Sequence, residues 1–155
     1  MANFVFNIAK GRVVEYYNRV KANDPANAAL ILVPLSASGT EAQGQDLDDL
    51  AAVEADANFA EQTAGSWVRK TLSDAELAAL PAPNDTDNRY DVQVPAVTWT
   101  APETGSDTTG LLICYDPDTT GGTDANIIPL VHCDFAVTAD GNDVELQVGD
   151  FFRAS

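Results

Sequence analysis

The order of apolar and polar residues predicts a helix at the start of the chain and a buried strand after it. Apolar side chains recur at helical spacing between residues 5 and 20, with the charged residues largely on the other face. Gly11 weakens this helix, and Asn23–Pro25 ends it, because the residue before a proline avoids the helical backbone region. The continuous apolar run Ala28–Leu35 then predicts a short buried strand.

Residues 36–87 have a different composition and are expected to form an insertion with short helices. After a polar loop, Asp46–Ala60 has apolar residues at helical spacing, and Asp46 is its expected N-cap. A second short helix is expected over Asp74–Leu80, because Ser73 and Glu76 have the spacing of a capping box.

From residue 88 onward the pattern is typical of β-structure, and Asp140–Asp143 is expected to form a tight hairpin turn. The fold class is therefore mainly β with short helices: an antiparallel β-sandwich with an N-terminal helix. We expect a single domain, residues 1–155, with the helix in 1–24, the insertion in 36–87 and the main β region in 88–155. The expected strands of the β region are Tyr90–Val94, Val97–Trp99, Leu111–Tyr115, Ile127–Val137 and 144–148. The expected core includes Leu30, Leu32, Val94, Trp99, Leu112, Cys114, Val131, Cys133, Phe135, Val144 and Leu146.

The net charge of the chain limits the classes of partner that we expect it to bind. The chain has 24 acidic and 8 basic residues, a formal net charge of −16, so we expect neither a nucleic-acid partner nor an anionic membrane. Residues 1–21 carry four basic residues and one acid, whereas residues 22–155 carry four basic and 23 acidic ones. The basic segment can dock on its own acidic body or on an acidic neighbour, and the sequence leaves both open.

The sequence offers little for catalysis. His132 is the single histidine, and a Ser–His or Cys–His mechanism would need it. No nucleophile-elbow motif accompanies it, so we expect a surface or hydrogen-bonded strand histidine, no enzymatic activity and no cofactor.

Cys114 and Cys133 fall on neighbouring expected strands, opposite each other if the turn centres between residues 123 and 124. Buried free thiols are favoured, with a disulfide left open.

One acidic loop deserves comparison with calcium sites. Asp116, Asp118 and Asp124 match the first, third and ninth positions of an EF-hand loop. The twelfth position is Ile127, not the bidentate glutamate, and no helices are expected beside the loop. We therefore favour a solvated turn and no metal, with these three aspartates as weak calcium candidates.

Several short phrases form a series along the chain: Met1–Lys10, Ala29–Leu35, Asp91–Thr100 (DVQVPAVTWT), Leu111–Asp116 (LLICYD), Leu130–Phe135, Thr138–Asp143 and Phe152–Ser155. In this order they resemble a group of small virion proteins of tailed bacteriophages. The resemblance implies a short helix followed by a β-sandwich with a V-T-W-T strand and a terminal F-R-A strand, and it supplies no active site. It is weakest in residues 36–88.

The resemblance implies a structural role in the virion, assembled in the host bacterial cytoplasm. A capsid decoration (cement) protein on the head surface is the first interpretation, with the major capsid protein or other virion proteins as partners and a homo-oligomeric state. The alternative is a tail, collar or fibre component, including one that contacts the host. A calcium- or glycan-binding β-sandwich is a third.

The expected interface lies in the segment Phe4–Lys21. The helical pattern has apolar positions broad enough for one of two adjacent tyrosines to face outward, and Tyr and Arg dominate interface hot spots. The interface residues are Arg12, Tyr16, Tyr17 and Arg19.

Overall fold

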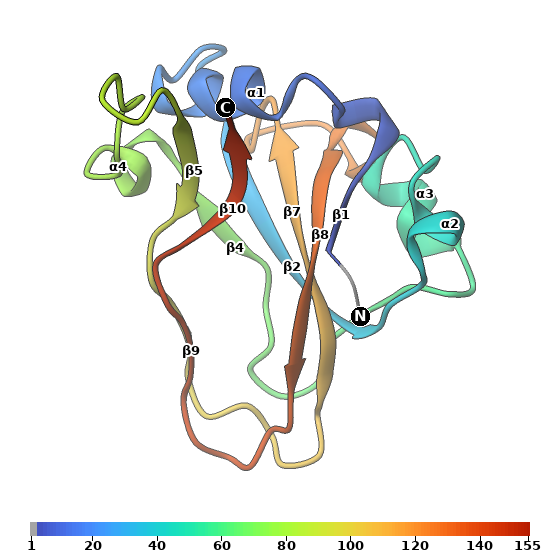
Figure 1. The fold of residues 1–155 in the computed structure, drawn as a ribbon. Helices are drawn as coiled ribbons and strands as arrows, with labels where there is room; N and C mark the ends of the chain where they lie inside the picture. The colour runs from blue at the N-terminus through green and yellow to red at the C-terminus, as the bar shows by residue number, and fades with distance from the viewer. Residues whose placement is uncertain (1–2) are drawn as a thin grey trace.

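The structure, a computed structural model, describes residues 3–155. The protein is mainly β, with antiparallel sheets and short helices, as the sequence predicts (Figure 1). The strands are β1 (Phe4–Val5), β2 (Ala29–Ala37), β3 (Ala60–Glu61), β4 (Lys70–Leu72), β5 (Tyr90–Val94), β6 (Val97–Trp99), β7 (Thr108–Asp116), β8 (Ile128–Val137), β9 (Val144–Leu146) and β10 (Gly149–Ala154). The largest sheet has the order β1-β8-β7-β2-β3, with β4 also paired to β2, and β10–β5 and β6–β9 form two-stranded ribbons.

Strand β2 lies inside the large sheet and is covered on both faces. It pairs with β7 along one edge, and with β4 and then β3 along the other. Leu30 and Leu32 belong to the core cluster that includes β5 and β6 side chains, whereas Ile31 and Val33 belong to a second cluster on the opposite side. Burial of both faces explains why this strand is a continuous apolar run rather than an alternating one.

Different elements pack against the two faces of the large sheet. One faces the ribbons β10–β5 and β6–β9, with α1 (Val13–Lys21) across one end of the molecule (Figure 1). The other is covered by side chains from α3 (Leu50–Ala55) and its neighbourhood, among them Leu50, Val53 and Phe59. An antiparallel β-sandwich with the N-terminal helix packed on or beside it was expected; in the structure, two short ribbons and α1 face one side of the large sheet, and side chains around α3 cover the other.

The expected helix over residues 5–20 is wrong in its first half. Phe4–Val5 forms β1 and pairs with β8, and a short 3-10 helix, η1 (Asn7–Ala9), follows. Helix α1 begins only at Val13, because Gly11 has a φ of +79°, a left-handed conformation that interrupts a helix. The end at Lys21 agrees with the predicted stop.

The segment 36–87 holds three short helices. Besides α3, they are α2 (Glu41–Gly44), which was not expected, and α4 (Asp74–Leu77). Helix α3 is capped by Asp49, not by Asp46, so it is shorter than predicted. Both hydrogen bonds of the predicted Ser73–Glu76 capping box are present on α4. The segment also supplies Trp67 to the main core.

The expected hairpin at residues 140–143 is wrong in its pairing. Strand β9 pairs with β6, with Glu145 opposite Thr98, and not with the preceding β8. The carboxylate of Asp143 accepts a hydrogen bond from the backbone N–H of Ala101, 2.9 Å away, just after β6. The segment therefore carries the chain from one sheet to another.

No helix within residues 3–155 has both the length and the apolar character needed to cross a membrane.

Candidate functional site

The outward face of α1, together with its N-cap residue Arg12, carries two arginines that share one glutamate. We call this surface the basic face of α1. Arg12 Nε lies 3.2 Å from Glu15 Oε2, and Arg19 Nη2 lies 2.9 Å from Glu15 Oε1. The arginine side chains are 48% and 47% exposed. The hydrogen bond from Arg12 lowers the pKa of Glu15, so this carboxylate stays ionised. Three charged side chains therefore give the face a net charge of +1.

Both tyrosines of α1 are buried, so the expectation that one faces outward is wrong. Tyr16 stacks on Tyr115 of β7, with ring centroids 4.7 Å apart. Tyr17 contacts Tyr90 of β5 and Phe151 of β10, and burial raises its pKa to about 12. The helix lies between the large sheet and the β10–β5 ribbon, and its adjacent positions face different strands. Of the four expected interface residues, only Arg12 and Arg19 present exposed side chains.

The aspartates of the calcium candidate have separate partners. Asp116 Oδ1 accepts a hydrogen bond from the N–H of Asp118, and Asp118 Oδ1 accepts one from the N–H of Thr120, each 3.0 Å long. Asp124 instead binds Arg69, with Oδ1 2.7 Å from Nη1. Within residues 3–155, no group of three or more His, Cys, Asp and Glu side chains is placed to hold a metal ion. The turn uses its carboxylates to hold its own backbone and a neighbouring arginine.

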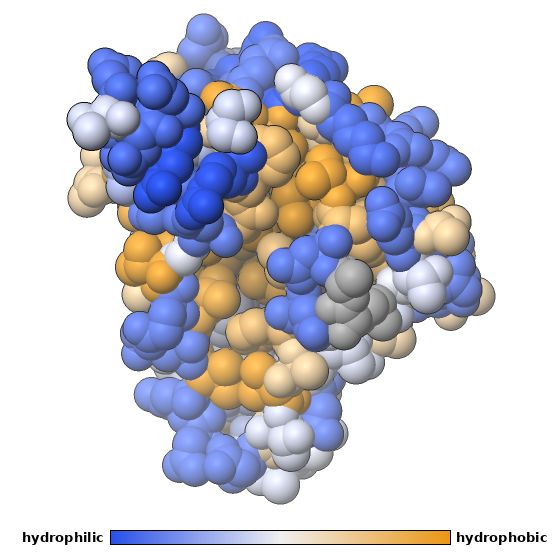
Figure 2. Space-filling model, in the orientation of Figure 1, coloured by the Kyte–Doolittle hydropathy of each residue, from blue (hydrophilic) through white to orange (hydrophobic). Residues whose placement is uncertain are grey.

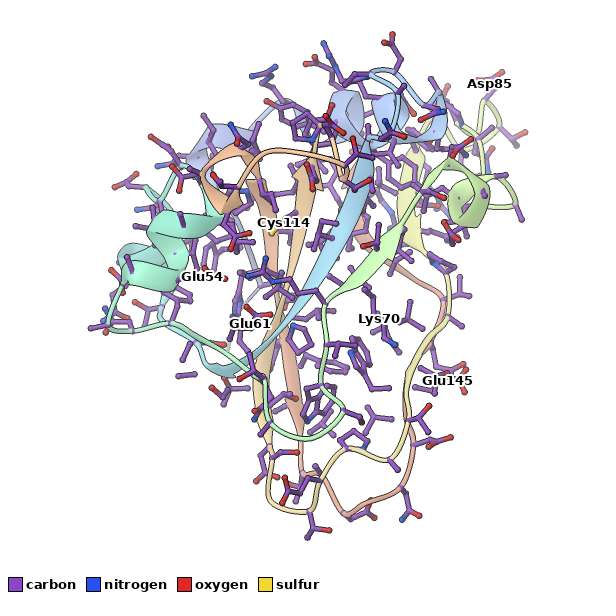
Figure 3. The ribbon with its side chains drawn as sticks, turned by 180° about the vertical axis from the view of Figure 1, so that it is seen from behind. Glu54, Glu61, Lys70, Asp85, Cys114 and Glu145 are labelled. Atoms are coloured by element: carbon purple, nitrogen blue, oxygen red, sulfur yellow. The ribbon has the colours of Figure 1, made fainter. Side chains whose placement is uncertain are left out.

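Arg69 is the centre of an ion-pair cluster that the sequence analysis missed. Its Nε and Nη2 donate to the two carboxylate oxygens of Glu61, at 2.9 and 2.8 Å. It also pairs with Glu54 of α3 and with Asp124 of the 3-10 helix η2 (Asp124–Asn126). Figure 3 shows Glu54 and Glu61 on the same side of the molecule. The basic pair Arg69–Lys70 in an otherwise acidic segment was the available signal, but the partners of Arg69 are distant in sequence.

Arg69 carries one positive charge beside three carboxyl groups, and one of these groups, Glu54, has a raised pKa. Burial, with smaller contributions from Asp124 and Glu61, raises the pKa of Glu54 to about 7, although Arg69 opposes the shift. The hydrogen bond from Arg69 instead lowers the pKa of Asp124. The cluster joins α3, β3 and η2 and contains one carboxyl group that titrates near neutral pH.

His132 and the two cysteines lie on β7 and β8 of the large sheet. His132 is fully buried on β8, so a surface position is wrong, and its ring stacks on Phe4 at a centroid distance of 5.0 Å. Cys114 lies opposite Pro129 and Cys133 opposite Leu111, and both thiols are free. Burial raises the pKa of both, to about 11 for Cys133, which disfavours the reactive thiolate.

Comparison with protein-family models, with curated proteins and with solved structures found no match.

Proposed function

We propose that the protein is a non-enzymatic structural component of a tailed-phage virion, and specifically a capsid decoration protein on the head surface. The support from the sequence is the series of phrases that resemble such proteins. Several of them lie on framework strands: Val97–Trp99 forms β6, Leu111–Asp116 lies in β7 and Phe152–Ala154 lies in β10. A resemblance of this kind concerns a building block rather than an active site.

The observation that carries the proposal is the exposed basic face of α1 on an otherwise acidic protein. The apolar face of α1 is used on its own domain, where Tyr16 and Tyr17 are buried, and Lys21 donates hydrogen bonds to the carbonyl oxygens of Leu80 and Pro81. Arg12 and Arg19 remain outward. The same helix therefore docks on its own body and presents positive charge to a neighbour.

This arrangement suits a protein that coats a surface in many copies. The acidic bodies, with 23 acids and four bases over residues 22–155, repel one another and stay soluble. The basic face supplies complementary charge to an acidic surface of the major capsid protein or of another copy. Single exposed charges contribute little energy, so their main effect is on orientation and rate of association.

The test is the protein's abundance in purified particles of the phage that encodes it. Quantitative mass spectrometry should find it at a copy number comparable with that of the major capsid protein, on heads separated from tails. A low copy number on tails or collars would replace the decoration role with the tail, collar or fibre alternative. Absence from purified particles would overturn the virion proposal altogether.

A further inference from the structure

Three carboxylates converge on one nitrogen of Arg69, and we call these four residues the Arg69 cluster. The Nη2 atom carries two hydrogens, but oxygens of Glu54, Glu61 and Asp124 all lie within hydrogen-bonding distance of it. Glu61 also accepts from Nε, at 2.9 Å, and Asp124 also accepts from Nη1, at 2.7 Å. Glu54 contacts Arg69 through the shared Nη2. Glu54 is therefore the carboxylate with the fewest hydrogen bonds from Arg69.

The titratable groups that face Glu54 come from several elements of the structure. On α3 itself, the carboxylates of Asp49 and Asp56 accept hydrogen bonds from backbone N–H groups at the two ends of the helix. Strand β2 has no titratable side chain, and the Nζ of Lys70 is directed to the ring of Trp99. The facing groups are Glu61 of β3, Arg69 before β4, Asp124 of η2 and the Cys114 thiol of β7. One positive charge thus faces three carboxyl groups.

A proton on Glu54 relieves the repulsion within the Arg69 cluster. The protonated carboxyl group can donate a hydrogen bond to Glu61 or Asp124, each of which lies within its reach. Burial also favours the uncharged form of Glu54 and raises the pKa of this group to about 7. Near neutral pH the cluster therefore exists in two forms, one protonated and the other with two uncompensated negative charges.

Helix α3 is the element that this repulsion can displace. It has six residues, too few for a helix that is stable by itself in water. At its start, the N–H of Leu50 donates to the carbonyl oxygen of Ile127, 2.9 Å away, and the side chains of Leu50 and Val53 pack in the smaller core cluster. Glu54 is the next residue, so its charge lies beside the apolar contacts that hold the helix on the sheet.

The same apolar contacts cover Cys114. This side chain is completely buried on β7, in one cluster with Leu50 and Val53 of α3. The charges of the Arg69 cluster also affect the pKa of Cys114, which places its thiol close to them. Figure 3 shows Cys114 in the same part of the molecule as Glu54 and Glu61. Displacement of α3 would therefore expose this thiol to solvent.

We propose that α3 is a proton-controlled cover: loss of the proton on Glu54 loosens α3 from the large sheet and gives solvent access to Cys114. The opening is local, because the larger core, with Trp67 and Trp99, is a separate cluster. The closed form binds the proton more tightly than the open form does. Closure is therefore favoured at acidic pH and weakens as the pH rises through about 7. The inference depends on the Arg69 cluster and does not rest on the virion proposal.

Thiol labelling of the folded protein measures this opening. Mass spectrometry assigns the label to Cys114 or Cys133 in the wild type, so neither cysteine needs to be replaced. The reference is Glu54→Gln, because its amide keeps a donor and cannot ionise. The labelling rate of Cys114 in the wild type is divided by its rate in Glu54→Gln at the same pH, which removes the pH dependence of thiol reactivity. This ratio should rise about tenfold between about pH 5.5 and about pH 8.

Two controls make the result specific. Glu41→Gln, an exposed change on α2, is the matched variant and should label at Cys114 at the wild-type rate at both pH values. Urea well below the unfolding transition should barely change the labelling rate of Cys114 at about pH 8, because a local opening exposes little surface. Circular dichroism and a thermal melt verify folding. If Glu54→Gln does not fold, the labelling rate of the urea-unfolded wild type at each pH replaces it as the reference.

A ratio for Cys114 that stays constant between the two pH values would overturn the inference, as would a Cys114 that is labelled only when the protein unfolds. A labelling rate that rises with urea as steeply as global unfolding would show that the whole fold opens, and would overturn the local cover. None of these results bears on the copy number of the protein in virions.

Discussion

Trp67 and Trp99 lie against each other in the main core, with ring centroids 5.2 Å apart, although they come from separate parts of the chain. Trp67 precedes β4, and its indole N–H donates to the carbonyl oxygen of Ser106. Trp99 ends β6, and its indole N–H donates to the carbonyl oxygen of Val68 at 2.8 Å. The pair thus fastens the segment before β4 to the β6–β9 ribbon.

Replacing Trp99 with alanine should therefore destabilise the protein strongly. The side chain is completely buried, and removing a buried aromatic residue of this size costs about 3–5 kcal/mol. Urea unfolding measures the loss, with Val148→Ala as the control, because Val148 is 55% exposed. An unchanged free energy of unfolding in Trp99→Ala would mean that the core is assigned wrongly.

Gly110→Ala should destabilise the large sheet. An added Cβ would lie 2.5 Å from His132 Nε2 and against the hydroxyl of Ser38, and overpacking of this kind costs about 1–3 kcal/mol. Gly121→Ala is the matched control, because its Cβ would meet only Asp118 Oδ2, at an ordinary 3.5 Å. Equal melting temperatures for the two variants would contradict the close approach of Gly110 to β8.

Calcium should not stabilise the protein. The three candidate aspartates, Asp116, Asp118 and Asp124, have separate partners, so melting temperatures in EDTA and in excess calcium should agree. A real site saturated at about 100 times its dissociation constant would add about 2.7 kcal/mol. A shift that Asp116→Ala abolishes would show that the loop binds calcium.

Glu54→Gln should reduce the pH dependence of stability around neutral pH. The folded protein raises the pKa of Glu54 to about 7, so folding favours the protonated carboxyl. The stability gained in this way is complete below the ordinary glutamate pKa and is lost as the pH rises through about 7. The free energy of unfolding of the wild type minus that of Glu54→Gln should therefore be lower at about pH 8 than at about pH 5.5.

The pKa shift of Asp124 in the same cluster does not interfere. The pKa of Asp124 is lowered, so its contribution is present above the ordinary aspartate pKa and is lost only in more acidic solution. Glu41→Gln, an exposed change on α2, serves as the control and should keep the wild-type pH dependence. If the free energies of unfolding of the wild type and of Glu54→Gln differ by the same amount at both pH values, this would contradict the raised pKa of Glu54.

The double variant Arg12→Glu with Arg19→Glu should fold normally but enter virions less efficiently. Both side chains are about half exposed, and each forms its ion pair with Glu15, so the melting temperature should change little. Copies per particle, measured by mass spectrometry, should fall. Normal incorporation of the folded variant would remove the basic face of α1 from the assembly interface.

Some local signals in the sequence predicted local structure correctly, although the expected cap at Asp46 was wrong. The Ser73–Glu76 capping box and the end of α1 were both confirmed, since each depends on residues a few positions apart. Pairings between strands that are far apart in the sequence were harder to predict. The alternating pattern of Val144–Leu146 identifies a strand but not its partner, so the nearest strand was chosen and β6 was missed.

The same difference between local signals and long-range contacts explains why predictions for the candidate sites were wrong. EF-hand-like spacing grouped Asp124 with Asp116 and Asp118, but Arg69, 55 positions away, binds Asp124 instead. The helical pattern of α1 predicted one contact face. It could not show that the helix lies between two sheets, which buries Tyr16 and Tyr17 together.

Pro34, in the middle of β2, has a consequence for how this strand finds its alignment. Its carbonyl oxygen accepts a hydrogen bond from the N–H of Gln62, on the edge away from β7. Its nitrogen, which has no hydrogen to donate, faces the same edge, between the stretches paired with β4 and β3. In a strand with one solvent face, a one-residue slip would expose apolar side chains, but β2 is apolar on both faces. A slip would instead turn Pro34 toward β7 and leave a buried carbonyl without a donor, at a cost of about 1–3 kcal/mol. An absent hydrogen atom thus helps to select the correct alignment of a strand that is buried on both faces.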